Sequence, residues 1–405
     1  MVRIWSLIPL SITLISSTFA LAQHADANLN SIKGIAKTFD SMKGTGFSPY
    51  INSPGAAPAL AAEGQFVGNA AQVPTSAAAP KTPPYQYIRS GDQADLVAPP
   101  RPGYALMGGG TDQDDAFRWL CNHANGGDFL VLRASGDDAY DAYIQGLCKL
   151  NSVATLIIPS REAALDSKIA PFAAETIAHA EAIFIAGGDQ ANYINFWMGT
   201  QVQTALNAAI RRGVPLGGTS AGLAVMGEWA YSAQGDKPDD PNLDGKTALS
   251  DANGPRITLV HGFLNIPVLK GIITDSHFAK RNRMGRLLVF LAHIQEPDGN
   301  AVPIPEGIHG IGIDERGAVL VEPDGQATVA GKTNAWFVTA SNNCGIAGKN
   351  AAMLSCGPIP VVRVEPGHHF DLKSWTPSQP GDGKSYILSV DKGAIHSSQS
   401  DSSIY

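Results

Sequence analysis

The sequence has no long run of lysine or arginine, and its acidic residues outnumber its basic ones by 36 to 29, which leaves a formal charge of −7 over 405 residues. Proteins that bind nucleic acids usually present a basic surface, so this balance argues against a nucleic-acid partner. The four cysteines form no C-x₂-C pair, the spacing typical of zinc sites. We therefore expect no bound metal.

Nucleotide-binding loops are also missing. Gly108-Gly109-Gly110 follows the apolar residues 104–107, as a phosphate-binding loop would follow a strand. The residues around it form neither G-x-G-x-x-G nor a Walker A pattern with its lysine. A tight turn from a strand into a helix explains the glycines better, and we expect no organic cofactor.

The N-terminal region has few features of a folded domain. Arg3 precedes a mostly apolar segment, and Ala20-Leu21-Ala22 has the small-x-small pattern of a cleavage site. Residues 1–22 therefore predict a secretory signal peptide; the alternative is a retained membrane anchor, for which the segment is short. Residues 23–102 are rich in Ala, Pro, Gly and Ser and predict a linker or propeptide. We expect a secreted or periplasmic protein with no stable membrane insertion after cleavage.

From residue 103 to 405 the pattern is that of one folded domain. Apolar stretches at 129–132, 153–158 and 182–185 alternate with helical stretches, which predicts an α/β fold with a mainly parallel sheet and helices on both faces. Beyond residue 315 short strands and turns follow one another instead. We expect a β-rich C-terminal extension at about 318–395 that packs on the same domain.

One serine lies in the kind of turn that exposes a nucleophile. Gly218-Thr219-Ser220-Ala221-Gly222 follows the apolar residues 214–216 and precedes another apolar stretch. In a G-x-S-x-G elbow the sharp turn lifts the hydroxyl above the sheet and aims the next backbone N–H at the reacting oxygen. An ordinary glycine-rich turn is the alternative explanation.

A hydroxyl nucleophile needs a base, and the base needs a group that orients it. The short strand-like segment 270–274, with Ile272 and Ile273 at its centre, ends in Asp275-Ser276-His277, and the apolar residues 310–313 end in Asp314-Glu315. Polar groups at the carboxyl ends of strands in an open α/β sheet meet in one crevice. The order serine, histidine, carboxylate also differs from the Ser, Asp or Glu, His order of the α/β-hydrolases, which weakens a lipase or esterase interpretation.

With these motifs the chain resembles cyanophycinase and its relatives in the dipeptidase E group of serine peptidases. The resemblance runs from about residue 103 to the C-terminus and rests on five blocks: 106–110 (Leu-Met-Gly-Gly-Gly), 185–190 (Ile-Ala-Gly-Gly-Asp-Gln), 218–222, Asp275-Ser276-His277-Phe278 through Arg281, Arg283 and Arg286, and 312–315 (Gly-Ile-Asp-Glu). It implies a class I glutamine amidotransferase-like fold.

The resemblance also implies roles for individual residues. Ser220 is then the nucleophile, His277 its general base and Glu315 the carboxylate that orients the imidazole. Asp275 is the rival carboxylate, because it is only two residues from His277. The implied substrate-binding or pocket-supporting residues are Gln190, Asp275, Ser276, Arg281, Arg283 and Arg286. Cyanophycinases commonly have glutamine at the position of Ser276, and this departure bears on cyanophycin specificity more than on hydrolysis.

An oxyanion hole is expected beside the serine. The N–H of Ala221 is one donor, because it follows the nucleophile directly. Gly187-Gly188 follows the apolar residues 183–185, and glycines let the main chain approach closely, so Gly188 is a candidate for the other donor.

The arginines can be interpreted without the family. Arg283 and Arg286 are three residues apart on an expected helix and share a face, whereas Arg281 is rotated away. Guanidinium groups bind carboxylates in a bidentate manner, so the pair could hold a substrate carboxylate. A solvated helix face, or internal salt bridges to Asp275 and Glu315, is the alternative.

The cysteines fit an exported protein, in which two disulfides form readily. We favour Cys121–Cys148 and Cys344–Cys356, because each pair closes a local loop. The other pairings and free buried thiols remain alternatives.

The sequence thus predicts an exported serine peptidase that hydrolyses β-aspartyl-arginine links of cyanophycin or related isoaspartyl peptides. Another esterase or amidase on the same fold and a catalytically silent peptide-binding relative are the alternatives. The peptide substrate is the one partner we expect, and a homodimer is an assembly that the sequence allows.

Overall fold

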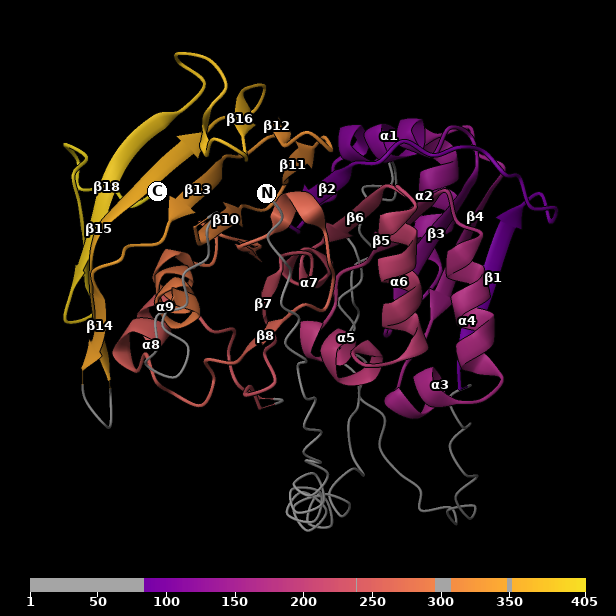
Figure 1. Cartoon of the computed structure of the whole chain (residues 1–405), viewed down its shortest axis with the longest axis horizontal. Coiled ribbons are helices and arrows are strands. Elements are labelled where there is room, and N and C mark those ends of the chain that lie inside the picture. The colour runs from indigo at the N-terminus through magenta and orange to yellow at the C-terminus, as the bar shows by residue number, and fades with distance from the viewer. Residues whose placement is uncertain (1–83, 238, 296–306, 348–351) are drawn as a thin grey trace, which may run out of the picture. The chain divides into compact units, whose positions relative to one another are not determined.

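The computed structural model describes residues 84–237, 239–295, 307–347 and 352–405 (Figure 1). The predicted signal peptide (1–22) and most of the predicted linker (23–102) lie outside these ranges. The described residues all fall in one compact unit, Phe47–Tyr405. None of their helices has both the length and the apolar character needed to cross a bilayer.

The first sheet contains ten strands among the described residues. They are β1 (Gln86–Gly91), β2 (Tyr104–Met107), β3 (Asp128–Arg133), β4 (Ser152–Ile157), β5 (Ala182–Ile185), β6 (Leu216–Thr219), β11 (Gly317–Val321), β12 (Gln326–Gly331), β16 (His369–Asp371) and β17 (Thr376–Pro377). The strands β4-β3-β5-β6-β2 run parallel in that order. β1 is antiparallel at one edge, and β11, β12, β16 and β17 extend the other edge antiparallel.

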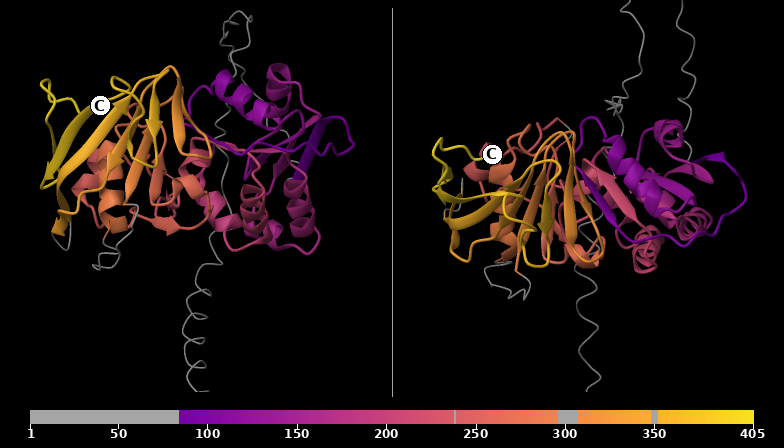
Figure 2. Two further views of the ribbon diagram at one scale, coloured as in Figure 1. Left: turned by 45° about the horizontal axis from the view of Figure 1, so that its top comes forward. Right: turned by 90° about the horizontal axis from the view of Figure 1, so that it is seen from above.

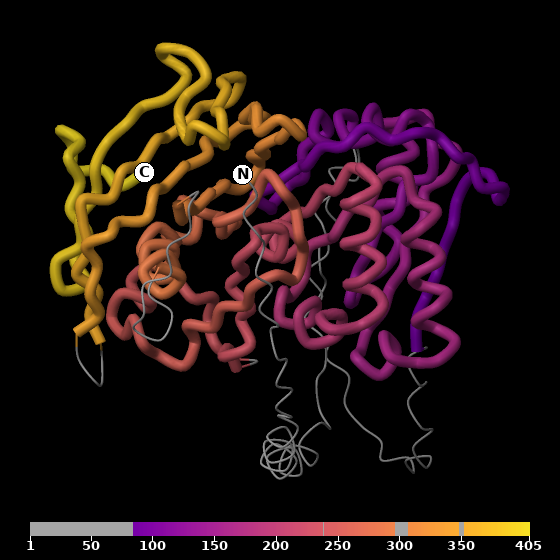
Figure 3. The backbone as a smooth tube through the Cα atoms, viewed as in Figure 1, coloured from indigo at the N-terminus to yellow at the C-terminus, as the bar shows by residue number. Residues whose placement is uncertain are grey.

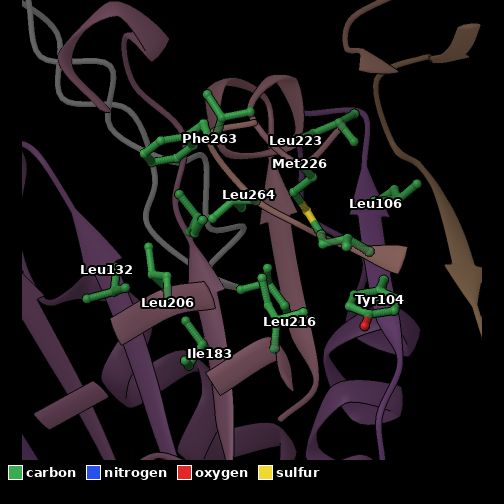
Figure 4. Close-up of a cluster of buried hydrophobic side chains, with 14 of the residues drawn as sticks. Tyr104, Leu106, Leu132, Ile183, Leu206, Leu216, Leu223, Met226, Phe263 and Leu264 are labelled. Carbon is green, nitrogen blue, oxygen red and sulfur yellow. The ribbon is translucent and has the colours of Figure 1, made fainter. Parts of the chain in front are cut away.

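Helices cover both faces of this sheet (Figure 2). α1 (Asp114–His123) and α2 (Ala139–Leu147) pack on one face, and α3 (Arg161–Leu165), α4 (Ile169–Ala178), α5 (Gln190–Trp197) and α6 (Gln201–Arg211) on the other. β2 shows why: Tyr104 and Leu106 lie in the core with α4 and α6, while the intervening Ala105 and Met107 lie in the core with α1. Figure 4 shows Tyr104 and Leu106 in the first of these cores with Leu206 of α6. A strand that is buried on both faces is typical of a parallel sheet.

The second sheet contains nine strands among the described residues. They are β7 (Trp229–Tyr231), β8 (Leu259–His261), β9 (Ile272–Asp275), β10 (His309–Ile313), β13 (Ala335–Thr339), β14 (Cys344–Ala347), β15 (Met353–Val364), β18 (Lys384–Asp391) and β19 (Ala394–Ser397). Their order is β19-β18-β15-β13-β10-β9-β7-β8, with β14 paired to β15. Only the pairs β10-β9 and β9-β7 are parallel.

The second sheet also packs on both faces. α8 (Gly245–Ser250) and α9 (Met284–Gln295) share a core with one face. The other face meets the first sheet: Ile311 and Phe337 lie in the same core as Val319 and Val329. The short helix α7 (Ala221–Ala224) follows β6, and a 3₁₀ turn (Pro267–Leu269) precedes β9. After β6 the chain passes from the first sheet to the second, and it returns to the first sheet twice, for β11 and β12 and then for β16 and β17. Its path can be followed in Figure 3.

The predicted α/β fold is confirmed, with two differences of detail. The predicted linker contains an ordered strand, since β1 pairs along its whole length with β4. The predicted β-rich C-terminal extension is present, but its strands are divided between the two sheets, which the sequence did not indicate. The sequence did not predict the second sheet, since its strands have the same apolar character as those of the first.

Both disulfides of the favoured pairing are present. Cys121 of α1 bonds to Cys148, which directly follows α2, and so joins the two helices on one face of the first sheet. Cys344 and Cys356 stand opposite each other in β14 and β15 and are also bonded. No free cysteine remains in the described residues.

Candidate active site

Ser220 stands at a sharp corner between β6 and α7. Its backbone has φ of 53° and ψ of −110°, a conformation that a serine rarely adopts. The flanking glycines make the corner possible: a Cβ on Gly218 would lie 2.6 Å from the carbonyl carbon of Gly222, and one on Gly222 would lie 2.0 Å from the oxygen of Ile185. The structure therefore forms the predicted elbow, and the strain of Ser220 is held by its neighbours.

Ser220, His277 and Glu315 form a continuous hydrogen-bonded chain. Oγ of Ser220 lies 2.8 Å from Nε2 of His277, and Nδ1 of His277 lies 2.8 Å from Oε1 of Glu315. A carboxylate only accepts hydrogen bonds, so Nδ1 carries the proton and Nε2 is free to accept from the serine hydroxyl. The three groups have the geometry of a nucleophile, a base and an orienting carboxylate.

The base comes from a different sheet than the nucleophile. His277 follows β9 and Glu315 follows β10, both in the second sheet, whereas Ser220 follows β6 in the first. The expectation that all three lie along the crevice of one sheet is therefore wrong. Two sheets bring their strand ends together here.

His277 is buried and uncharged. Burial, followed by the nearby guanidinium groups of Arg281 and Arg283, lowers the pKa of His277 to about 3. Its side chain is 7% exposed, which leaves little water to solvate an imidazolium ion. At neutral pH the ring is therefore in the form that can take a proton from Ser220.

The three glycines that follow β2 contact or make room for His277 and Glu315, a role that the sequence did not predict. The carbonyl of Gly108 accepts from the backbone N–H of His277 at 2.8 Å. A Cβ on Gly109 would lie 2.6 Å from Nε2 of His277, and one on Gly110 would lie 3.0 Å from Cβ of Glu315. The missing side chains thus leave room for the imidazole and its carboxylate. No local sequence signal could show this contact, because the glycines and the histidine follow strands of different sheets.

Of the two segments expected to supply oxyanion donors, Ala221 directly follows the serine, and the Gly187-Gly188 turn approaches it through Gly187. Ala221 is the first residue of α7, where a backbone N–H has no partner within the helix. A Cβ on Gly187 would lie 3.5 Å from Cβ of Ser220, and Gly188 follows with a φ of 144°, which favours glycine. Tyr193 steadies this turn, since its hydroxyl donates to the carbonyls of Ala186 at 2.7 Å and Gly187 at 3.3 Å.

Asp112 is a second feature that the sequence did not reveal. Its carboxylate accepts from the hydroxyl of Thr219, the residue before the serine, at 2.8 Å, and from the hydroxyl of Tyr140 at 2.5 Å. Burial raises the pKa of Asp112, while these two hydrogen bonds lower it. The contacts tie the strand that carries the nucleophile to α2.

The carboxylate of Asp275 makes its side-chain hydrogen bonds to Arg286, whereas the base is hydrogen-bonded to Glu315. Nε of Arg286 donates to Oδ2 of Asp275 at 2.8 Å while the terminal nitrogen binds Oδ1. The guanidinium of Arg286 also donates to the carbonyl of Leu243 at 2.8 Å and lies 5.1 Å from the ring centre of Tyr231. Arg286 is 2% exposed, and its guanidinium is occupied by Asp275 and by the carbonyl of Leu243. Its position fits the supporting role that the sequence left open.

Arg283 and Ser276 are also deep in the protein. Arg283 precedes α9, and its guanidinium donates to the carbonyl of Ser276 at 2.8 Å and to the hydroxyl of Ser276 at 3.3 Å. Burial, followed by the charge of Arg286, lowers the pKa of Arg283 to about 9. Arg283 thus stands just before α9 and not within it, and both Arg283 and Arg286 are buried beside Asp275, as the internal salt-bridge alternative predicted.

Two of the predicted substrate-binding side chains are accessible. Arg281 is 32% exposed, and its Nε lies 3.7 Å from Oε1 of Glu315. Gln190 is half-buried at the start of α5, after Asp189 has capped that helix by accepting from Ala191 N–H at 2.9 Å. These two residues therefore remain candidates for direct contact with a substrate.

A metal centre is not evident in the part of the chain that the structure describes, where no three His, Cys, Asp or Glu side chains gather as ligands.

Residues 163–324 match the sequence profile of peptidase family S51. This range contains Ser220, His277 and Glu315, so the predicted resemblance to cyanophycinase-like serine peptidases is confirmed for this part of the chain.

Among characterised relatives, the chain is similar to the cyanophycinases of Geminocystis herdmanii (strain PCC 6308), with 33% identity over 39% of this chain and 49% of the relative, and of Trichormus variabilis (strain ATCC 29413 / PCC 7937), with 33% identity over 38% and 44%. The chain spans about half the length of these relatives. Among solved structures, a peptidase from an acI-B1 Actinobacterium aligns with 67% of this chain and 98% of its own, at 15% identity and a TM-score of 0.42.

Proposed function

We propose that this protein is a serine peptidase that acts through an acyl-enzyme on Ser220. The observation that carries the proposal is the unbroken sequence of contacts from the Ser220 hydroxyl through His277 to Glu315, each 2.8 Å long. The match of this region to peptidase family S51 supports it.

The geometry supports the following steps. Nε2 of His277 takes the hydroxyl proton while Oγ of Ser220 attacks the scissile carbonyl carbon. The backbone N–H groups of Ala221 and Gly188 stabilise the oxyanion, and Glu315 stabilises the imidazolium ion that forms. His277 then gives its proton to the leaving amine. Water, activated by His277 in the same way, releases the acyl group and restores the serine.

We further propose that the substrate is a β-aspartyl peptide, such as the β-aspartyl-arginine links of cyanophycin. Arg281 is the accessible guanidinium beside the base, and it could bind the free α-carboxylate that a β-linked aspartate keeps next to the scissile bond. An α-linked aspartate offers its carboxylate at a different distance. The relatives named cyanophycinase support this substrate class.

Kinetics on matched α- and β-aspartyl-arginine peptides tests the substrate. We expect a higher kcat/KM for the β-linked peptide, and Arg281→Lys should lose much of that preference, because lysine keeps the charge but not the bidentate geometry. Equal kcat/KM values for the two peptides in the wild type would exclude the isoaspartyl assignment and leave a general serine hydrolase, such as an esterase or amidase.

The nucleophile has its own test. Ser220→Ala should fold normally, lose labelling by a fluorophosphonate probe and lose turnover by roughly 10⁴-fold or more. Ser250→Ala is the matched control, since Ser250 is an exposed serine whose hydroxyl donates to the carbonyl of Thr247 at 2.8 Å. A wild-type protein that resists labelling would point to the catalytically silent, peptide-binding alternative.

Export is part of the proposal. The apolar segment before Ala22 and the two disulfides support it, because disulfides persist in oxidising compartments. N-terminal sequencing of the exported protein should give Gln23 as the first residue. Retention of Met1 in the exported protein would contradict signal cleavage.

A further inference from the structure

The turn that carries His277 is held by a residue far outside the matched range 163–324. We call residues 276–283, between β9 and α9, the base loop. His277 has a φ of 46° and Asn282 a φ of 50°, so two residues of this loop occupy a backbone region that disfavours side chains. Such conformations persist only where the surrounding structure holds them.

Tyr405, the last residue of the sequence, binds the end of the base loop. Its hydroxyl accepts from the backbone N–H of Met284 at 2.9 Å, at the first residue of α9. The same hydroxyl donates to Oδ1 of Asn282 at 3.1 Å. Burial raises the pKa of Tyr405 to about 12, so the hydroxyl keeps its proton and can donate at any physiological pH. One side chain thus joins the strained Asn282 to the start of the helix.

The ring of Tyr405 reaches the other end of the loop. It meets Phe278, the residue after His277, edge to face at 5.9 Å between ring centres. It also meets Trp336 of β13 edge to face at 5.6 Å, and Trp336 lies 5.6 Å from Phe278. On its other side Phe278 presses against Gly312, where a Cβ would lie 2.4 Å from the ring. Phe278 is therefore enclosed between β10 and these two aromatic rings.

We propose that Tyr405 is a positioning residue for His277, which clamps the base loop through Phe278 at one end and through Asn282 and Met284 at the other. The inference rests on the proposed function and deepens it. Edge-to-face aromatic pairs and hydroxyl hydrogen bonds both favour a defined geometry, and a misplacement of about 1 Å in a catalytic group can lower a rate about 100-fold. The strands after residue 324 thereby take part in placing the base.

Three variants of the full chain test the clamp. Tyr405→Phe keeps the ring and removes both hydrogen bonds, whereas Tyr405→Ala removes ring and hydroxyl. Tyr143→Phe is the matched control, because it also removes one tyrosine hydroxyl, which donates to Asp114 at 2.7 Å. Tyr143 packs with α1 and α2 on the first sheet, whereas Phe278 of the base loop lies in a different core. We expect kcat to fall roughly 3- to 10-fold in Tyr405→Phe and further in Tyr405→Ala, with KM little changed and the control near wild type.

Two further measurements separate positioning from general stability. Loosening the loop admits water to His277, so the acid limb of the pH–rate profile should move up toward pH 6.5, the ordinary pKa of histidine. Hydrogen–deuterium exchange should rise in the base loop and the start of α9 while β3 and β5 keep wild-type protection. Wild-type exchange in the base loop of Tyr405→Ala, or an equal rise throughout the protein, would overturn the clamp.

The exchange measurement does not depend on turnover. If the wild type neither hydrolyses peptides nor labels at Ser220, the proposed function fails. The base-loop exchange of the Tyr405 variants would still show whether Tyr405 holds the loop, so the two failures can be told apart.

Discussion

The nucleophile and the base are held in different ways by the two sheets. Ser220 is fixed within its own sheet, because Gly218 and Gly222 of its pentapeptide allow the sharp corner and Gly222 packs against Ile185 of the neighbouring strand β5. His277 is fixed from a distance, by Gly108 and Gly109 of the first sheet, by Glu315 after the next strand and by the aromatic contacts of Phe278. A motif is enough to place the first group, whereas the second depends on how the two sheets meet.

Among changes around the base, the largest expected effect concerns the carboxylate that holds it. Glu315→Gln should lower kcat by roughly 10² to 10⁴-fold, because the amide neither fixes the imidazole tautomer nor balances the imidazolium charge. Steady-state kinetics with circular dichroism to verify folding is the measurement.

Asp275→Asn is the comparison variant. It leaves the buried Arg286 without its counter-charge, so it should lower the melting temperature more than Glu315→Gln does. A severe loss of kcat in a stable Asp275→Asn, together with a nearly silent Glu315→Gln, would transfer the orienting role to Asp275.

The same contrast explains what the sequence could predict. The buried strands β2 to β6, the serine elbow and the Asp-Ser-His turn are local patterns, and each appears in the structure where the sequence put it. The second sheet, the contact of Gly109 with His277 and the pairing of Asp112 with Thr219 join residues distant in the chain. The arginines show the same limit, since the spacing left both a substrate contact and internal salt bridges to Asp275 open, and the structure has the pairing with Asp275.

A change at the contact between the sheets should have an intermediate effect. Gly109→Ala would put a Cβ 2.6 Å from Nε2 of His277, at a backbone φ of 91°. The imidazole must then move, and a displacement of about 1 Å can lower a rate by roughly 10- to 100-fold. We expect kcat to fall by that amount, measured on the β-aspartyl peptide.

Gly126→Ala serves as the control for backbone strain. Gly126 has a φ of 81°, and a Cβ there would meet nothing within 4 Å. Its substitution should lower stability without a specific loss of kcat. If the two variants lost activity equally, the contact with His277 would not be the cause.

The smallest effect is expected in the pH dependence. Burial, followed by the charges of Arg281 and Arg283, lowers the pKa of His277 to about 3, so the base stays unprotonated well below the ordinary histidine pKa of about 6.5. The specificity constant kcat/KM should therefore remain above half of its maximum at pH 5. An acid limb of the pH profile centred near pH 6.5 would contradict the burial of His277.

Folding stability gives an independent check of the same group. Between pH 6.5 and about 3 the unfolded chain binds a proton at His277 that the folded protein does not, so this residue makes stability fall as pH falls through that window. His277→Gln removes that proton binding. Its melting temperature should decline less than that of the wild type between pH 6.5 and 4, and an identical decline in both proteins would show that His277 titrates normally in the folded state. The comparison needs no substrate, so it tests how the second sheet holds the base apart from what the base does.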